Sequence, residues 1–567
     1  MRNLSKKLLL FLLIFALSFS GCRSKSKVSN GGNLSETGSN SWIVADTLPV
    51  SLPSATPRHN GSDDWRDEII YFLMTDRFSD GDSSNNQPFY NKANINYYHG
   101  GDLQGIINQI GYLRSLGVTA VWITPVVENV WQDPHYTDYT GYHGYWAYDF
   151  TKLDPHLGPN NDYYQQFIDI MHDNGILVIQ DIVTNHLGPL AYYEEGWTPP
   201  YQVSGYTRKF VGNYNSGHAE LLKAPFNELN AFHNYGLINN YEDSIQCTTG
   251  DLSDLPDLKT EADEVRKALT DAYRMWASLG VDGFRIDTAK HVEMDFWQYF
   301  CPKIRAEVGG ENFLQFGEVW NGSHSVLAKY VGNTGFDSVL NYDLYYVMRT
   351  VFGNVKDAYH TNATRELTEE LERRNNSYSP ASASELLVNF IDNHDNNRFL
   401  TDANGSLDRL WMSLTYLMTT KGIPCIYYNT ENNIQGDTNT GRKDLPDFAV
   451  TNKRTFTLIR VLSKIRQENE ALRRGTIDVL KDSNSAGIFA FVRSLSNDDP
   501  SENVLVLLNT SGQTINETIE VSGYASDGAE LKNILAAEFG LAESVTVANG
   551  SVTVSIPAYS MKIFKKL

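Results

Sequence analysis

The stretch Gly283-Phe284-Arg285-Ile286-Asp287-Thr288-Ala289-Lys290-His291 begins as a short β-type run and ends in charged and polar residues. It predicts a buried strand that delivers Arg285 and Asp287 to one face, because residues two apart in a strand point the same way. An Arg beside an Asp lowers the pKa of that carboxyl, and an ionised, oriented Asp is what a nucleophile requires. The alternative is a structural ion pair at a strand end, and the rest of the chain decides between the two.

Apolar strands and amphipathic helices alternate on both sides of this stretch. Helical periodicity covers 103–116, 161–174, 260–279, 292–308, 406–420 and 452–467. Together with the opening motif, eight strands are predicted, in EIIYFLM, VTAVWITPV, ILVIQDIV, GFRID, FLQFGEVW, SVLNYD, LLVNFID and GIPCIYY. Such alternation is typical of parallel βαβ units, and polar residues recur at the C-terminal ends of the strands. The sequence therefore predicts an α/β fold, a (β/α)8 TIM barrel with its active site at that end.

Two segments depart from the alternation. Residues 187–259 are rich in Tyr, Gly and Asn, show no clear period and are too long for an ordinary connection, which predicts a subdomain inserted after the third strand. After residue 470 the chain alternates β-branched and polar residues, which predicts a C-terminal all-β sandwich domain. The predicted units are a barrel over 61–186 and 260–469, an inserted subdomain over 187–259 and a β domain over 470–567.

The first 22 residues have the pattern of a targeting signal. Positive residues at positions 2, 6 and 7 precede the apolar run Leu8 to Phe19, which is too short to span a membrane comfortably, and Ser20-Gly21-Cys22 follows. This resembles a bacterial lipoprotein signal in which Cys22 becomes the lipidated first residue. Phe19 stands where such signals more often carry Leu, so plain secretion is the alternative. Residues 23–60 are poor in apolar side chains and predict a flexible linker. We therefore expect a membrane-anchored lipoprotein at the cell surface or the periplasmic face.

Composition limits the class of partner. The net charge of -21 argues against nucleic acid, which usually leaves a basic footprint, and favours a neutral substrate. The aromatic content of 12 % suits stacking on flat apolar faces such as those of sugar rings, although most of these rings fill the core. Beyond Cys22 the cysteines are widely scattered and form no disulfide framework or metal spacing. A monomer is expected.

Three carboxylates stand at three separate strand ends: Asp287, Glu318 in FGEVW and Asp395 in FIDNHD. Glycoside hydrolysis requires one nucleophile and one proton donor across the scissile bond, and a further anion favours the developing oxocarbenium charge. Glu318 lies among aromatic and apolar neighbours, which favour the protonated form of a carboxyl, so we assign it as the acid/base. Each carboxylate alone could be structural, but their repetition at strand ends indicates a catalytic set.

A loop after the first strand collects hard oxygen donors. Asp80, Asp82, Asn85 and Asn86 lie within seven positions, and Asp102 follows in GGDLQG. Carboxylate and amide oxygens on one irregular loop suit Ca²⁺, which takes six to eight oxygen ligands in flexible geometry. The alternative is an ordinary turn rich in Asp and Asn.

Four stretches in this order resemble the signature motifs of the α-amylase family of glycoside hydrolases: DIVTNH (181–186), GFRIDTAKH (283–291), GEVW (317–320) and FIDNHD (390–395). HGYWAYDF (143–150), FSDGDSSNN with GGDLQG, and LPDL resemble further motifs of the family. The resemblance covers roughly residues 65–567. Among the family's members, cyclodextrin glucanotransferases and the related bacterial α-amylases are most similar.

The resemblance implies a retaining mechanism with Asp287 as nucleophile, Glu318 as acid/base and Asp395 as stabiliser of the transition state. It implies substrate binding by residues that grip the sugar at the cleavage site, orient the nucleophile or stack on rings on either side of the bond: Tyr145, His143, His186, Arg285, Lys290, His291, Trp320, His394 and Arg442. It also implies two calcium sites, one between barrel and inserted subdomain and one in the first loop: Asn185, Asp257 and the His291 carbonyl; and Asp80, Asp82, Asn85, Asn86, Gly100 and Asp102.

The chain departs from its cyclising relatives in three places. Ser253 stands before Asp254, where those enzymes carry a large aromatic around which the glucan chain curls. The sequence ends after one β domain, whereas those enzymes usually carry further modules. Both departures favour hydrolysis over cyclisation. The segment GDTNTGRKD (436–444) matches only loosely the sugar-binding segment of those relatives, which makes Arg442 the weakest of the substrate-binding assignments.

These patterns predict a calcium-dependent, lipid-anchored α-amylase that cleaves α-1,4-glucosidic bonds within starch and maltodextrin chains. The alternatives within the family are a cyclodextrin glucanotransferase and an enzyme of the cyclomaltodextrinase or neopullulanase type. The alternative from another class is a non-catalytic starch-binding lipoprotein, which would lack a catalytic carboxylate.

Overall fold

The computed structural model describes residues 40, 43, 55–194, 198–210, 222–310, 312–353, 355–446, 448, 453–495 and 499–566. The predicted signal segment with Cys22, and most of the predicted linker, lie outside these residues. None of the helices within them combines the length and the apolar character that crossing a membrane requires.

A closed ring of parallel strands forms the centre of the molecule. Its members in chain order are β1 (Ile70–Leu73), β2 (Ala120–Ile123), β5 (Leu177–Ile182), β8 (Gly283–Ile286), β9 (Leu314–Gly317), β10 (Ser338–Val339), β11 (Val388–Asn389) and β12 (Ile423–Tyr427). They form one 8-stranded sheet in the order β10-β9-β8-β5-β2-β1-β12-β11, and a parallel bridge from Leu340 to Val388 joins its two ends. The predicted (β/α)8 barrel is confirmed.

Side chains fill the interior of the barrel, and the register of the strands places some of them at the same level along the barrel axis. Phe72 of β1 lies opposite Trp122 of β2 on one side and Tyr427 of β12 on the other. The Phe72 ring stacks on Trp122 at 3.8 Å and on Tyr427 at 5.2 Å between ring centroids. Such stacks add to the large apolar area that aromatic residues bury. This aromatic layer contacts the polar residues at the strand ends, because Trp122 Nε1 donates a hydrogen bond to Asp181 Oδ2 at 3.0 Å.

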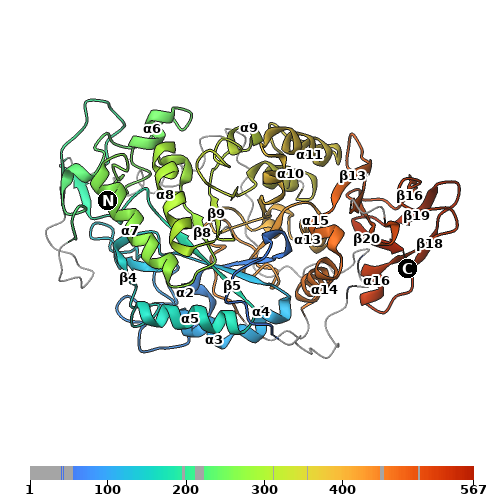
Figure 1. Cartoon of the computed structure of the whole chain (residues 1–567), viewed down its shortest axis with the longest axis horizontal. Coiled ribbons are helices and arrows are strands. Elements are labelled where there is room, and N and C mark those ends of the chain that lie inside the picture. Colours follow the sequence, from blue (N-terminus) through green and yellow to red (C-terminus); the bar gives the residue numbers. More distant parts are fainter. Residues whose placement is uncertain are drawn as a thin grey trace.

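Helices cover the outside of the barrel, as Figure 1 shows for α3, α4, α5, α7 and α8. Their bounds are α3 (Leu103–Asn108), α4 (Ile110–Leu116), α5 (Asn161–Asp173), α7 (Asp263–Ser278), α8 (Met294–Val308), α10 (Tyr342–Val351), α11 (Arg365–Ser377), α13 (Leu407–Thr419) and α14 (Arg454–Glu468). The helix predicted over 103–116 is two helices, because the backbone of Gln109 leaves the helical region at φ -109° and ψ 15°. Short helices α2 (Thr75–Phe78), α9 (His324–Leu327), α12 (Phe399–Asp402) and α15 (Glu470–Arg474) complete the shell.

Two long connections extend from the C-terminal end of the barrel, one after β2 and one after β5. The first is the antiparallel pair β3 (Val127–Asn129) and β4 (Ala147–Leu153), whose connection carries Tyr142, His143 and Tyr145. The second follows β5 and contains the pair β6 (Ala191–Tyr193) and β7 (Arg208–Phe210), the 3-10 turn η2 (Leu229–Ala231) and α6 (Ser244–Thr249). This second connection is the inserted segment that the sequence predicts after the third barrel strand.

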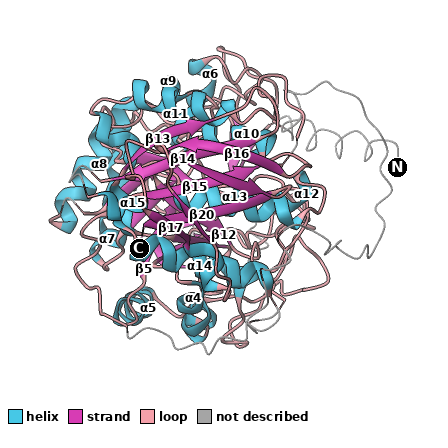
Figure 2. Ribbon diagram, turned by 90° about the vertical axis from the view of Figure 1, so that its right-hand side faces the viewer, coloured by secondary structure: helices cyan, strands magenta, loops and turns pink. Residues whose placement is uncertain are grey.

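The chain ends in two antiparallel sheets. One has the order β13-β14-β15-β20-β17-β18 and the other pairs β16 with β19. Their bounds are β13 (Thr476–Lys481), β14 (Ile488–Ser494), β15 (Val504–Asn509), β16 (Ile515–Glu520), β17 (Glu530–Asn533), β18 (Ser544–Thr546), β19 (Ser551–Ile556) and β20 (Ser560–Lys566), with α16 (Ile534–Glu538) between β17 and β18. Figure 2 looks at the molecule from this side, with the larger sheet in front of the barrel.

Strand β14 shows why this domain stays attached to the barrel. Its residues Ile488, Ala490 and Val492 pack into the apolar cluster between the two sheets. Phe489 and Phe491 point the other way, into the main core, where both contact Tyr416 of α13. Successive strand residues face opposite sides, so a strand buried on both sides reads as continuously apolar. The C-terminal all-β sandwich is confirmed, while the predicted limits of the individual units stay predictions.

Candidate active site

The three predicted catalytic carboxylates lie at the C-terminal end of the barrel. Asp287 follows the last residue of β8, Glu318 follows the last residue of β9, and Asp395 lies in the loop after β11. Because the carboxyl ends of parallel strands meet at one end of a barrel, these loops share one site. Asp287 and Glu318 are 6 % exposed, so both are shielded from bulk water by protein.

Arg285 connects the carboxylates. Its Nη1 lies 2.9 Å from Asp181 Oδ1 and 2.8 Å from Asp287 Oδ1, and its Nη2 lies 2.9 Å from Glu318 Oε1. The guanidinium is fully buried. Arg offers a planar set of donors that fits carboxylates, so one side chain holds three of them in fixed relative positions. The predicted pairing of Arg285 with Asp287 is therefore present, within a larger network.

The pKa of Asp287 is shifted upward overall, although Arg285 lowers it as predicted. Burial raises the pKa of Asp287 well above its ordinary value, Arg285 opposes this, and the neighbouring carboxylates Glu318 and Asp181 add to the rise. Burial also raises the pKa of Asp181 to about 6, again against the effect of Arg285. Removing a carboxylate from water outweighs one nearby cation when several carboxylates share it. Asp287 and Asp181 therefore take up protons more readily than isolated carboxyls do.

Glu318 is held by two hydrogen bonds beside an aromatic wall. The hydroxyl of Tyr342, the first residue of α10, donates to Oε1 at 3.1 Å, and the backbone N–H of Thr288 donates to Oε2 at 3.3 Å. Thr288 has a φ of 47°, in the left-handed region that a β-branched residue rarely adopts. Trp320 stacks on Tyr342 with ring centroids 5.2 Å apart. The apolar surroundings predicted for Glu318 thus come with three polar contacts that orient the carboxyl, two hydrogen bonds and the ion pair with Arg285.

Asp395 is held by its neighbour in the chain and by an arginine that follows β12. His394 Nε2 lies 3.1 Å from Asp395 Oδ2, and Arg442 Nη2 donates to Oδ1 at 3.1 Å. The structure therefore brings Arg442 into the site, where its contact is a carboxylate of the catalytic set. Tyr145 stacks on His394 with centroids 5.2 Å apart and rings within 9° of parallel, and its hydroxyl donates to Asp181 Oδ2 at 2.7 Å. Tyr145 thereby joins the Asp395 side of the site to the Arg285 network.

His186 is buried and His143 is half-buried, and both have lowered pKa values, which favour the neutral ring. His186 Nε2 donates to the Tyr145 carbonyl at 3.2 Å, and His143 Nδ1 accepts a hydrogen bond from the Tyr145 N–H at 3.0 Å. Burial lowers the pKa of His186 to about 4, and burial together with Arg442 lowers the pKa of His143 well below its ordinary value. Neutral imidazoles suit hydrogen bonding to sugar hydroxyls, because one nitrogen donates while the other accepts.

Lys290 and His291 belong to the turn η3 (Ala289–His291) that follows Asp287. His291 Nδ1 donates to the carbonyl of Cys247 in α6 at 3.0 Å, and its ring contacts Tyr241 edge to face. Burial lowers the pKa of His291 to about 4. The turn therefore lies where the inserted segment meets the catalytic strand, and the leaving-group role of Lys290 and His291 stays a prediction.

The first predicted calcium set comes together. The side-chain oxygen of Asn185 lies 2.9 Å from the His291 carbonyl oxygen and 3.2 Å from Asp257 Oδ1, with no hydrogen between them. Three oxygens at such distances repel one another unless a cation lies among them, and Ca²⁺ binds carboxylate, amide and backbone oxygens. Turning the amide over would relieve the repulsion by hydrogen bonds instead. In the orientation of the structure, the donor set fits calcium.

The second predicted set is partly engaged within the protein. Asp102 accepts hydrogen bonds from the N–H groups of Gly81, Asp82 and Gly105, and the last of these caps α3. The side-chain oxygens of Asn85 and Asn86 are buried and have no hydrogen-bond partner. A Cβ at Gly100 would lie 2.4 Å from Asn86 Oδ1, so glycine is required for the backbone to approach this side chain. Buried amide oxygens without partners fit a cation ligand, because a buried polar atom otherwise costs about 1 to 3 kcal/mol.

Sequence reasoning missed two residues of the site. Asp181 had a usable signal, because it is a charged residue inside an apolar strand, and the register places it opposite Arg285 of β8. Tyr342 had no sequence signal beyond its place after the sixth barrel strand. Its contact with Glu318 depends on the direction of α10 relative to that strand, which the local sequence does not show.

Comparison with known proteins gives the family. The model of the α-amylase catalytic domain matches residues 72–473. A β/α-amylase from Paenibacillus polymyxa is 31% identical over 518 residues, which cover 89% of this chain and 38% of that protein. This chain therefore spans less than half the length of that relative.

Two solved structures are also similar. An Anoxybacillus α-amylase has a TM-score of 0.74 and 29% identity, covering 89% of this chain and 99% of that one. A cyclomaltodextrin glucanotransferase with a three-domain ABC distribution has a TM-score of 0.73 and 31% identity, covering 88% and 98%. The chain therefore belongs to the α-amylase family and is a glycoside hydrolase.

Proposed function

We propose that the protein is an α-amylase that hydrolyses α-1,4-glucosidic bonds within starch and maltodextrin chains and retains the anomeric configuration. The observation that carries this proposal is the meeting of Asp287, Glu318 and Asp395 at one end of the barrel, with Arg285 joining two of them at 2.8 and 2.9 Å. A starch-binding lipoprotein without catalysis would not need these three carboxylates together. Their joint presence favours an enzyme.

Each carboxylate has one role in this mechanism. Asp287 attacks the anomeric carbon and forms a glycosyl-enzyme, while Glu318 gives its proton to the departing glycosidic oxygen. Glu318 then takes a proton from water, which attacks the same carbon and releases Asp287. Asp395 stabilises the positive charge that develops in both transition states. The neutral rings of His186 and His394 and the face of Tyr145 surround the place where the sugar would lie.

The choice of hydrolysis over cyclisation rests on Ser253. Cyclisation requires the far end of the glucan chain to swing back to the active site, which costs ordering entropy unless an aromatic surface holds the curled chain. Ser253 is half-buried and offers almost no apolar area. The number of C-terminal domains does not separate the two reactions, because a similar structure with three domains is a cyclomaltodextrin glucanotransferase. Water is therefore proposed as the main acceptor.

A product profile tests this proposal. We expect linear maltooligosaccharides from soluble starch and amylose, and much slower attack on pullulan and on cyclodextrins. Abundant cyclodextrins from starch would identify a glucanotransferase. Faster cleavage of cyclodextrins or pullulan than of starch would identify the cyclomaltodextrinase or neopullulanase alternative, and starch binding without any product would identify a binding protein.

We also propose that the enzyme is a monomer with two bound calcium ions. We further propose a lipid anchor at Cys22, which would hold the enzyme outside the cytoplasm. The converging oxygens around Asn185 and the unpartnered oxygens of Asn85 and Asn86 support the ions. Bound calcium would tie the inserted segment to the barrel. The positive, apolar and small-residue pattern of the first 22 residues supports the anchor. Labelled fatty acid should enter the full chain but not its Cys22→Ser variant.

A further inference from the structure

Three further ligand side chains meet beside the first calcium set, each from a different segment. His233 follows η2 in the inserted segment, Glu261 lies shortly before α7, and Glu293 directly precedes α8. One ring nitrogen of His233 and one oxygen of each glutamate all lie within 4.8 Å of one another. Neither the catalytic mechanism nor the predicted calcium sets use these residues.

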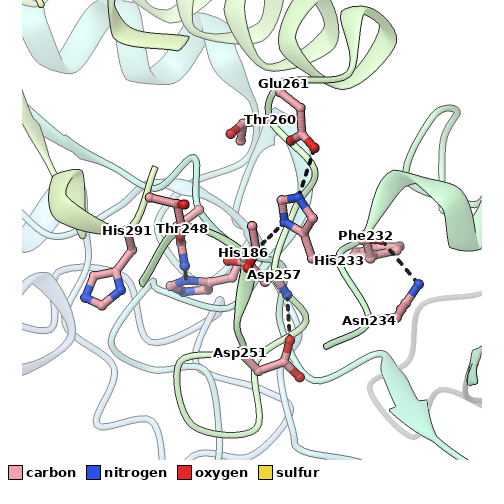
Figure 3. A network of polar contacts seen from close by, with 12 residues as sticks. His186, Phe232, His233, Asn234, Thr248, Asp251, Asp257, Thr260, Glu261 and His291 are labelled. Atoms are coloured by element: carbon pink, nitrogen blue, oxygen red, sulfur yellow. Dashed lines mark hydrogen bonds and ion pairs between the residues drawn. The ribbon is translucent and has the colours of Figure 1, made fainter. Parts of the chain in front are cut away.

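The imidazole of His233 is oriented from behind. Its Nδ1 pairs with Asp257 Oδ2 at 2.7 Å, which leaves Nε2 directed toward Glu261 Oε1 at 3.1 Å. Figure 3 shows His233 between these two carboxylates. The ring is 4 % exposed, so the protein fixes its direction. A buried carboxylate on one ring nitrogen with the other nitrogen facing further ligands is the usual arrangement of a metal-binding histidine.

Negatively charged side chains gather around the ring. Asp257, Glu261 and Glu293 are three carboxylates around one imidazole, and a proton on that ring supplies a single positive charge. The hydroxyl of Thr260 donates to Glu293 Oε2 at 2.7 Å, which orients this carboxylate but adds no charge. A divalent cation between Nε2 and the two glutamates would add positive charge beside these carboxylates, next to that of Lys259 and of the calcium proposed at Asp257.

The ligand types select the kind of cation. Ca²⁺ prefers oxygen ligands alone, whereas one imidazole nitrogen with carboxylate oxygens suits Zn²⁺ and similar first-row ions. Zinc bonds of about 2.0 to 2.2 Å place neighbouring tetrahedral ligands about 3.4 Å apart. The 3.1 Å between His233 Nε2 and Glu261 Oε1 is close to this, and the rest of the cluster, within 4.8 Å, needs small side-chain shifts. The two glutamates allow these shifts, because Glu261 is exposed and Glu293 is half-buried. Water would complete the coordination.

We propose that His233, Glu261 and Glu293 form a binding site for a divalent transition-metal ion, with Zn²⁺ as the reference ion. The ion would join the inserted segment to the starts of α7 and α8. Asp257 would be shared between the two metal sites, with Oδ1 in the calcium set and Oδ2 on His233. The transition metal would therefore also support the calcium set through one side chain.

The test measures zinc binding to the full enzyme with calcium kept in excess. Metal-stripped protein is reloaded with Ca²⁺ and titrated with Zn²⁺, and bound zinc and calcium are both counted by elemental analysis after gel filtration. We expect one Zn²⁺ per chain without loss of calcium, and a higher melting temperature. Glu261→Gln and Glu293→Gln keep the size of the side chains and should each weaken zinc binding at least tenfold. The matched control is Asp173→Asn, which alters the exposed pair of His59 and Asp173 and should leave zinc binding unchanged.

A cobalt spectrum gives a second readout that does not depend on activity. Co²⁺ bound by one nitrogen and two carboxylates in a low-coordinate site should show visible absorption that Zn²⁺ abolishes. The proposal is overturned if calcium-loaded protein binds no zinc, which would make the cluster an ion pair. It is also overturned if both glutamine variants bind zinc like the parent, or if zinc binds only by expelling calcium.

Discussion

Arg442 donates a hydrogen bond from Nη2 to Asp395 Oδ1 over 3.1 Å, although 47 positions separate the two residues in the chain. The same guanidinium donates from Nε to the His394 carbonyl at 2.9 Å. Arg442 therefore holds both the side chain of Asp395 and the backbone just before it. These contacts favour a role for Arg442 in positioning the carboxylate, while the sugar binding that the resemblance implied stays a prediction.

The Arg442→Lys variant should separate these roles. Lysine keeps the charge but cannot hold two acceptors in a fixed geometry, so Asp395 should lose its orientation. We expect kcat on maltooligosaccharides to fall roughly tenfold to a hundredfold with little change in KM, as misplaced catalytic groups usually cause. A raised KM with an unchanged kcat would instead show that Arg442 binds sugar.

The catalytic assignments predict two inactive but folded variants. Asp287→Asn keeps an acceptor for Arg285, and Glu318→Gln keeps one for Tyr342, so neither change removes packing. Hydrolysis by each should fall by about 10³-fold or more, because the covalent step or the proton transfer is lost. Starch hydrolysis and the melting temperature are measured side by side. Near-normal activity in either variant would contradict its assignment.

Calcium removal should weaken the fold. An ion that binds only the native state stabilises it by mass action, so exhaustive chelation should lower the melting temperature by several degrees. Added Ca²⁺ should restore it. In Asn86→Ala, which removes a buried unpartnered oxygen of the loop set, chelation should cause a smaller loss than in the parent. An equal loss in both proteins would place the ion elsewhere, and no loss in the parent would remove both sites.

Introducing an aromatic at position 253 should redirect part of the reaction. Ser253→Tyr supplies a surface for a curled glucan chain, so transfer products and some cyclodextrins should appear while hydrolysis continues. Ser253 has a φ of 62°, which strains a bulky residue, so Ser253→Gly serves as the control for backbone effects. Chromatography of products from soluble starch compares the three proteins. Equal profiles for the tyrosine and glycine variants would show that the aromatic ring has no effect.

His143 should make stability depend on pH. Burial and Arg442 lower its pKa in the folded protein, whereas the unfolded chain titrates near the ordinary value of about 6.5. Below that pH the unfolded state binds the proton first, so the stability contributed by the neutral ring is lost as pH falls. The melting temperature should drop less between pH 7 and pH 5 in His143→Gln, whose amide can still accept from Tyr145. Equal slopes would contradict this.

The sequence was sufficient for features with a local signal. All eight barrel strands are short apolar runs with polar ends, so their number and order could be predicted, and with them the common position of Asp287, Glu318 and Asp395. The geometry of contacts between distant segments could not. Nothing local to residues 436–444 places Arg442 on Asp395, and nothing local to Tyr342 places its hydroxyl on Glu318.

The net pKa shift of Asp287 could not be predicted from the sequence for a different reason. The pair Arg285 and Asp287 alone predicts a stabilised anion, but the outcome depends on how many carboxylates share the guanidinium and how much water surrounds them. Asp181 and Glu318 both contact Arg285, and all of these groups are buried. That sum of burial and competing charges reverses the direction expected from the pair.

The barrel is closed between β10 and β11 by the single bridge from Leu340 to Val388, which makes this the most weakly paired part of the ring. On either side of it, β10 and β11 pair with β9 and β12 at only two positions each, whereas β5, β8 and β9 are joined at four positions per pair. Local opening costs least where the fewest backbone hydrogen bonds hold an element. Local opening is therefore expected first at β10 and β11, the second of which leads to Asp395, whereas the strands that lead to Asp287 and Glu318 are joined to each other at four positions.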